Sequence, residues 1–117
     1  CSDTYGELTP ASALWLIKEL ELGPTDVFFD LGCGIGKILI IAALVSETCH
    51  IVGLELSTTR VQIAHQAILR VGLKHRCHVF REDFLRAPRL LEATVCYCAN
   101  TALPDSAVDE LTRRLSV

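Results

Sequence analysis

The sequence predicts an α/β domain built on a parallel, doubly wound sheet. Three observations favour this fold. Short apolar runs alternate along the chain with segments of helical spacing, and these runs are apolar on both faces. A glycine cluster directly follows the first run. Acidic or amide residues follow the other three, as expected where the carboxyl ends of parallel strands form a ligand-binding edge.

Length and composition argue against several other classes of protein. The chain has 117 residues, of which 50% are hydrophobic, so it suits one small globular domain and not a disordered segment. Its longest apolar run, Ile38 to Val45, is far shorter than the roughly 18–20 residues that span a bilayer. No basic segment leads into an apolar one at the amino end, so we expect no signal peptide.

Charge and cysteine content indicate which partners and which cellular compartment to expect. With a net charge of −3, we expect nucleic-acid contacts only through regions outside this chain. Of the six cysteines, Cys33, Cys96 and Cys98 lie in or beside predicted strands and are expected to be small buried hydrophobes, which favours a reducing compartment. One basic group is expected to be a solvated helix face, namely Arg60, Arg70, Lys74 and Arg76.

Four apolar runs predict buried strands, because each has the length of a strand and is bounded by turn residues. A Gly-Pro pair precedes the first run, and the glycine cluster ends it. The predicted strands are Asp26–Asp30, His50–Glu55, Cys77–Phe80 and Thr94–Cys98.

The segments around these strands predict helices. The one after the first strand is apolar all round, as in a helix packed on a sheet. The one after the second strand is apolar on one face and stops at Gly72, a typical helix end. Ser106 and Asp109 have the spacing of a capping box. The predicted helices are Ala11–Leu22, Lys37–Ser46, Thr58–Val71 and a last one from Pro104 or Asp105 to Leu115.

The turn after the first strand has the features of a cofactor loop. Gly32, Gly34 and Gly36 allow a tight turn and a close approach of the backbone to a ligand at a helix start. Asp30 precedes them, where a carboxylate would repel a pyrophosphate and attract an ammonium group. Lys37 stands where a dinucleotide fingerprint has its third glycine.

Three more residues extend this pattern along the same edge. Glu55 can accept hydrogen bonds from both ribose hydroxyls. Asp83 can accept one from the exocyclic amine of adenine, and Phe84 offers a ring face. An ammonium, a sugar diol and an adenine without phosphate describe S-adenosylmethionine better than NAD. Each residue alone has a simpler explanation, as a helix cap, a solvated strand end or a core residue, but the combination predicts a cofactor site.

These motifs resemble those of the class I S-adenosylmethionine-dependent methyltransferases. Within this class they are most similar to the non-SET histone lysine methyltransferases of the disruptor-of-telomeric-silencing type. Tyr5-Gly6-Glu7 resembles the signature loop that closes over the cofactor, and Val27–Lys37 resembles motif I. Val52–Glu55 resembles the acidic strand end, Glu82–Leu85 the adenine-binding segment, and Ala99–Leu103 the segment that lines the lysine channel.

The resemblance implies a Rossmann-like fold in which residues 1–117 are the amino-terminal part of a single catalytic domain, with the carboxyl-terminal strands absent from this chain. It implies S-adenosyl-L-methionine as cofactor, S-adenosyl-L-homocysteine as product and no metal. It implies that Asn100 lies beside the target amine, with Tyr5 as a second catalytic residue. The implied cofactor-binding residues are Tyr5, Gly6, Glu7, Leu8, Phe28, Phe29, Asp30, Leu31, Gly32, Cys33, Gly34, Ile35, Gly36, Lys37, Glu55, Asp83 and Phe84.

The implied activity is methylation of a protein lysine by direct methyl transfer, with a globular-core lysine of a nucleosomal histone as the best candidate and the nucleus as the location. Ala99, Thr101 and Leu103 depart from the family's asparagine and two aromatic residues. These departures leave open a non-histone protein lysine or a small-molecule acceptor. A non-catalytic module that binds an adenosine ligand is a third alternative, because the chain is expected to lack the carboxyl-terminal strands. An NAD-linked oxidoreductase is opposed by Asp30 and Lys37.

One further group has metal-ligand chemistry: His75, Cys77 and His78. Along a strand, residues 75 and 77 share a face while 78 points away. No second ligand pair has the spacing to complete four-coordination, so the sequence predicts no metal site.

Overall fold

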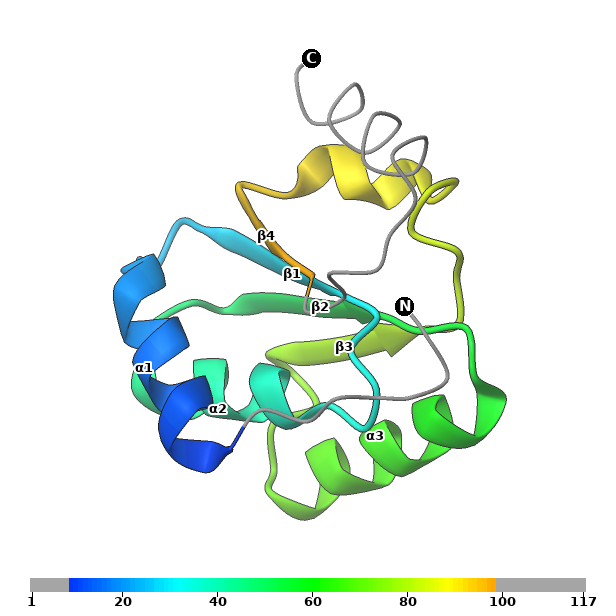
Figure 1. The fold of residues 1–117 in the computed structure, drawn as a ribbon, viewed down its shortest axis with the longest axis horizontal. Coiled ribbons are helices and arrows are strands. Elements are labelled where there is room, and N and C mark those ends of the chain that lie inside the picture. The colour runs from blue at the N-terminus through cyan, green and yellow to red at the C-terminus, as the bar shows by residue number, and fades with distance from the viewer. Residues whose placement is uncertain (1–8, 99–117) are drawn as a thin grey trace.

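The computed structural model describes residues 9–98, which form a four-stranded sheet in the order β3-β2-β1-β4 (Figure 1). The three strand pairs are parallel. The chain runs from β1 outward through β2 to β3 and then returns to place β4 on the other side of β1. A ligand crevice is therefore expected at the carboxyl ends of β1 and β4, where the strand order reverses. The strands are β1 (Val27–Leu31), β2 (His50–Leu54), β3 (Cys77–Phe80) and β4 (Val95–Tyr97).

Helices cover both faces of this sheet. Three α-helices lie on one face, and a short 3-10 helix lies on the other (Figure 1). Three of the four predicted helices and all four predicted strands are confirmed to within one or two residues, whereas the 3-10 helix was not predicted. The predicted helix between residues 104 and 115 lies outside the part of the chain that the structure describes. The helices are α1 (Pro10–Leu20), α2 (Lys37–Val45), α3 (Thr58–Arg70) and η1 (Pro88–Glu92).

Local chemistry sets the helix ends. The Thr9 side chain accepts a hydrogen bond from the Ser12 N–H, and Pro10 occupies the first turn of α1, where its missing N–H costs nothing. Glu21 then adopts a left-handed conformation, with φ of 50°, and ends α1 two residues before the predicted end. The Ser57 side chain caps α3 in the same way as Thr9 caps α1.

The core consists of two clusters, one on each face of the sheet. Alternate residues of β1 divide between them, so that Phe28 packs with the α-helices and Phe29 with η1. Leu90 of η1 is fully buried and closes the second cluster. Because both faces are covered, all four strands can be apolar throughout.

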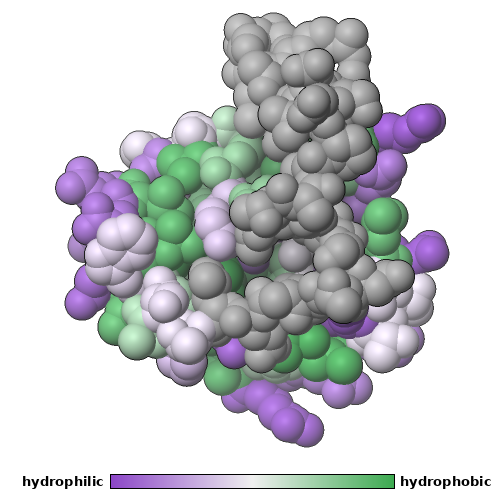
Figure 2. Space-filling model, viewed as in Figure 1, coloured by the Kyte–Doolittle hydropathy of each residue, from purple (hydrophilic) through white to green (hydrophobic). Residues whose placement is uncertain are grey.

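The outer surface of the helical layer is mixed in character. Figure 2 shows hydrophobic residues at the surface between hydrophilic ones. The large exposed apolar residues include Trp15 of α1, Leu44 of α2 and Leu69 of α3. Within residues 9–98, no helix combines the length and the apolar character that crossing a bilayer requires.

Arg76 has a structural role, so the prediction that it belongs to a solvated helix face is wrong. Its guanidinium donates hydrogen bonds to the carbonyl oxygens of Ala43 at 2.7 Å, Ser46 at 3.0 Å and Thr48 at 2.8 Å. These carbonyls lie at the end of α2 and in the turn to β2. Arg76 therefore satisfies backbone acceptors that the helix leaves unpaired.

We expect Arg76→Ala to lower the free energy of unfolding by about 2–3 kcal/mol, because several charge-assisted hydrogen bonds are lost together. Thermal and urea unfolding followed by circular dichroism measure this loss. The exposed Lys74 is a matched control, and Lys74→Ala should change stability by less than about 0.5 kcal/mol. Equal effects of the two substitutions would show that the Arg76 contacts contribute nothing.

Candidate cofactor-binding site

The glycine loop between β1 and α2 lies at the reversal of strand order. Gly32, Gly34 and Gly36 have φ values of 76°, 57° and 89°, in the left-handed region that favours glycine. Gly36 is also the N-cap of α2, and a Cβ at this position would lie 3.3 Å from the Cβ of Ala64 on α3. The predicted reason for the glycines, a tight turn at a helix start, is confirmed.

Hydrogen bonds join this loop to the end of β2. The backbone N–H groups of Gly32 and Cys33 both donate to the carbonyl oxygen of Leu54, at 2.7 and 3.1 Å. The next N–H, that of Gly34, donates to Oε1 of Glu55 at 2.9 Å. The end of β2 thus determines where the loop lies.

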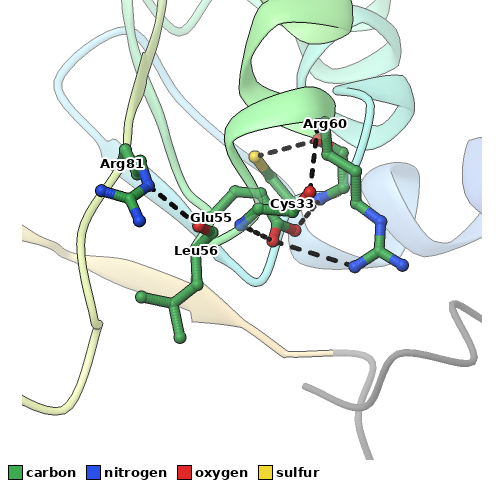
Figure 3. A network of polar contacts seen from close by, with 7 residues as sticks. Cys33, Glu55, Leu56, Arg60 and Arg81 are labelled. Carbon is green, nitrogen blue, oxygen red and sulfur yellow. Dashed lines mark hydrogen bonds and ion pairs between the residues drawn. The ribbon is translucent and has the colours of Figure 1, made fainter.

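Glu55 is a brace between the loop and α3 (Figure 3). It is only 7% exposed, and its Oε2 accepts a hydrogen bond from the Ser57 N–H at 2.9 Å. The Arg60 guanidinium lies 3.9 Å from the same oxygen. Because each carboxylate oxygen has a second lone pair, Glu55 can still accept from ribose hydroxyls. The brace itself was not predicted, and the only signal for it was the capping pattern at Ser57.

Asp30 is a buried acidic residue near the carboxyl end of β1, next to the glycine loop. It is only 3% exposed. Burial, together with smaller contributions from the nearby Cys98 and Glu55, raises the pKa of Asp30 to about 8. A buried carboxylate favours a positively charged ligand, because a cation offsets the cost of its burial.

The groups around Asp30 come from three elements. Tyr97 of β4 is its partner in the register of the parallel pair. Burial raises the pKa of the Tyr97 hydroxyl, and Asp30 and then Cys98 add to this effect. Burial also raises the pKa of the Cys33 thiol, with further contributions from Asp30 and Glu55. Cys33 is therefore a neutral thiol at pH 7 and not an activated nucleophile, in agreement with its predicted role as a small residue of the loop.

Asp83 and Phe84 form a turn after β3. Oδ1 of Asp83 accepts a hydrogen bond from the Leu85 N–H at 3.0 Å, and its carbonyl oxygen accepts one from the Arg86 N–H at 2.9 Å. Phe84 is 7% exposed and packs in the second core cluster, so its ring has a structural role. That either residue contacts adenine stays a prediction.

The remaining predicted residues fall into three groups. Phe28, Phe29 and Leu31 are fully buried in the core, so only their backbone can face a ligand. Ile35 and Lys37 are half-buried in and next to the loop. Tyr5, Gly6, Glu7, Leu8 and Asn100 lie outside the described residues.

The predicted absence of a metal site concerns the region around β3. Cys77 is buried, with its Sγ 3.6 Å from the carbonyl oxygen of Leu39, whereas His78 is exposed. Within residues 9–98, no three histidine, cysteine or acidic side chains lie close enough to hold a metal ion together.

Comparison with known protein families and sequences gives concordant results. The family model described as histone methylation protein DOT1 matches residues 1–98. A histone-lysine N-methyltransferase, H3 lysine-79 specific, from Caenorhabditis elegans is 46% identical over 56 residues, which are 48% of this chain and 6% of that protein. The protein of the same name from Emericella nidulans is 30% identical over 100 residues, with 77% of this chain and 19% of that protein covered.

The match to a shorter relative covers a larger share of that relative's length. A protein-lysine N-methyltransferase from Saccharolobus islandicus is 31% identical over 88 residues, which cover 74% of this chain and 54% of that protein. The chain thus spans well under two thirds of each of these three relatives.

Solved structures show the same fold. An RNA methyltransferase from Salinibacter ruber, in complex with S-adenosyl-L-homocysteine, matches with a TM-score of 0.74 and 30% identity over 92% of this chain and 67% of that one. A SAM-dependent methyltransferase from Geobacter sulfurreducens matches with a TM-score of 0.80 over 98% of this chain and 47% of that one, at 21% identity. The predicted Rossmann-like methyltransferase fold is confirmed.

Proposed function

Because the chain belongs to the DOT1 family of histone methylation proteins, we propose that it forms the cofactor-binding part of an S-adenosylmethionine-dependent protein lysine N-methyltransferase. The observation that carries the proposal is Asp30, a buried carboxyl group next to a glycine loop at the strand reversal. This arrangement suits a ligand with a positive charge close to a nucleoside. The relatives named as lysine methyltransferases support the same conclusion.

In this proposal, different residues of the site bind the different parts of the cofactor. Asp30 binds the ammonium of the methionine moiety, and the glycine loop allows its close approach. Glu55 accepts from the ribose hydroxyls, and Asp83 with Phe84 adjoins the adenine. Tyr5 to Leu8 would close over the bound cofactor, as the resemblance implies.

The proposed reaction needs alignment more than acid–base chemistry. The bound cofactor supplies an electrophilic methyl group on a sulfonium. The chain's own residues exclude water and align a neutral lysine amine with that methyl, which accounts for most of the acceleration. Desolvation lowers the pKa of the lysine amine and favours its neutral form. We propose that Asn100 accepts a hydrogen bond from this amine and orients its lone pair.

The proposed acceptor is a globular-core lysine of a nucleosomal histone, and the proposed location is the nucleus. The three H3 lysine-79 specific or protein-lysine relatives support a protein lysine as acceptor. Thr101 and Leu103 stand where the family has aromatic residues, so a non-histone lysine or a small molecule is the second candidate. In either case, contact with nucleosomal DNA would come from regions outside this acidic chain.

Calorimetric titration and a methylation assay test the proposal. We expect the full-length protein to bind S-adenosylmethionine and S-adenosylhomocysteine, and to bind no NAD. With a radiolabelled methyl donor, we expect it to label nucleosomes in preference to free histones. Binding of NAD alone would overturn the assignment of Asp30, and equal labelling of unrelated peptides would overturn the histone acceptor.

We expect Asn100→Ala to lower the turnover number by about 10²-fold, because the amine loses the group that orients it. The affinity for S-adenosylhomocysteine should stay within about twofold, because Asn100 is proposed to contact the acceptor. Single-turnover methylation and calorimetry separate the two effects. An unchanged turnover number would remove Asn100 from the mechanism.

A further inference from the structure

We propose that a contact between Gly53 of β2 and Cys33 of the glycine loop sets the position of the loop toward the cofactor. Gly53 is then a positioning residue of the site, although it touches no cofactor itself. The inference rests on the proposed function, because it assumes that the loop binds S-adenosylmethionine.

Position 53 requires a glycine because there is no room for a side chain, and not because of its backbone conformation. Its φ lies outside the left-handed region that Gly32, Gly34, Gly36 and Gly72 occupy. A Cβ at Gly53 would lie 2.5 Å from Sγ and 2.9 Å from Cβ of Cys33, closer than real Cβ atoms approach. Glycine weakens the interior of a strand, and its presence there indicates close approach of another segment.

The segment that approaches Gly53 is the cofactor loop. Cys33 is 1% exposed, so its side chain is enclosed against β2. Its N–H and that of Gly32 donate to the carbonyl oxygen of Leu54, the residue after Gly53. The loop is thus held to β2 by backbone hydrogen bonds and fitted to it by one side chain.

Adding one methyl group at Gly53 must move the loop, because one of the two contacting side-chain atoms of Cys33 is its Cβ, which is bonded directly to the loop backbone. Restoring ordinary van der Waals distances requires a shift of Cys33 by about 1 Å. The neighbouring Gly34 N–H would then leave its 2.9 Å hydrogen bond with Glu55. A misplacement of this size in a binding site costs about 10²-fold in function.

A second contact at the same position provides a control. The added Cβ would also lie 2.7 Å from Cδ1 of Leu39, a fully buried residue of α2. This contact presses on the core and not on the loop. In Gly53→Ala, shortening the Leu39 side chain should therefore restore stability without restoring affinity. Shortening the Cys33 side chain should restore affinity.

Four variants of the full-length protein test the proposal by calorimetric titration with S-adenosylhomocysteine and by thermal unfolding. We expect Gly53→Ala to weaken binding at least 10-fold. Cys33→Gly alone removes the contact without pushing the loop away, so it should weaken binding less than Gly53→Ala does. The double variant Gly53→Ala/Cys33→Gly should bind as tightly as Cys33→Gly alone, because the added methyl group then meets no Cys33 side chain. Gly53→Ala/Leu39→Ala should bind as weakly as Gly53→Ala.

Natural affinity in Gly53→Ala, or equal recovery of affinity by the two double variants, would overturn the proposal. If Gly53→Ala does not fold, Cys33→Val enlarges the same contact from the loop side and should weaken binding in its place, and natural affinity in Cys33→Val would equally overturn it. Failure of the natural protein to bind S-adenosylhomocysteine would overturn the proposed function and this inference together. Binding by the natural protein with no loss in the variants would overturn this inference alone.

Discussion

Replacement of Asp30 by Asn is expected to weaken cofactor binding and to stabilise the ligand-free protein at alkaline pH. The affinity for S-adenosylmethionine should fall by about 10- to 100-fold, because the ammonium loses a charged partner. Stability should rise because Asp30 is only 3% exposed, and its ionised form is costly there. Opposite effects on binding and stability are typical of a residue kept for function.

The direction of the pH dependence follows from the pKa of Asp30. Burial raises it from 3.8 to about 8 in the folded protein. Between these values the folded state keeps a proton that the unfolded state has lost. The free energy of unfolding therefore falls as the pH rises from about 4 to about 8, by at most about 1.4 kcal/mol per pH unit. Asp30→Asn removes this contribution, so its advantage should be near zero only below about pH 4, small at pH 5 and largest at pH 9.

Thermal unfolding at pH 5 and pH 9, with calorimetric titration at pH 8, measures both effects. Asp26→Asn is the matched control at the other end of β1. Hydrogen bonds from the Gly23 N–H and the Thr94 hydroxyl lower the pKa of Asp26. This variant should lose stability and keep its affinity. A variant at Asp30 that binds as tightly as the natural protein would remove Asp30 from the cofactor site.

The sequence predicted the fold well because apolar runs and helical spacing are local signals. The strand Cys77–Phe80 was predicted to the residue, and the helix from Lys37 ended one residue early. η1 was missed because five residues beginning at Pro88 are too few to show a helical period. The early end of α1 depends on the left-handed Glu21, for which the sequence has no signal.

The site was predicted less completely. Asp30, the glycines and Glu55 were assigned to one edge, because a parallel topology brings strand ends together. The contacts within that edge were not predicted, since Glu55 meets Gly34 across 21 residues and Cys33 fits against Gly53 across 20. Such contacts depend on strand register and loop depth, which local patterns do not specify. Arg76 was misassigned for the same reason, because its acceptors lie about 30 residues earlier in the chain.

Replacement of Glu55 is expected to weaken cofactor binding through both the ribose and the loop. Glu55→Ala removes two acceptors from the Gly34 and Ser57 N–H groups, and should lower the free energy of unfolding by about 2–3 kcal/mol and the affinity by about 100-fold. Glu55→Gln keeps one acceptor oxygen and should lose about tenfold in affinity. Calorimetry and thermal unfolding measure these effects. Glu47→Gln, in an exposed turn at the opposite end of β2, should change neither quantity.

The two roles of Glu55 can be separated with a changed ligand. A 2′-deoxy analogue of S-adenosylhomocysteine lacks one hydroxyl that Glu55 is proposed to bind, and it leaves the loop unchanged. If Glu55 binds the ribose, loss of the hydroxyl should cost less in Glu55→Gln than in the natural protein, because the partner is already impaired. If Glu55 only braces the loop, the two losses should be equal and additive. Equal losses together with a weakened Glu55→Gln would assign Glu55 to the loop alone, and the ribose would need another acceptor.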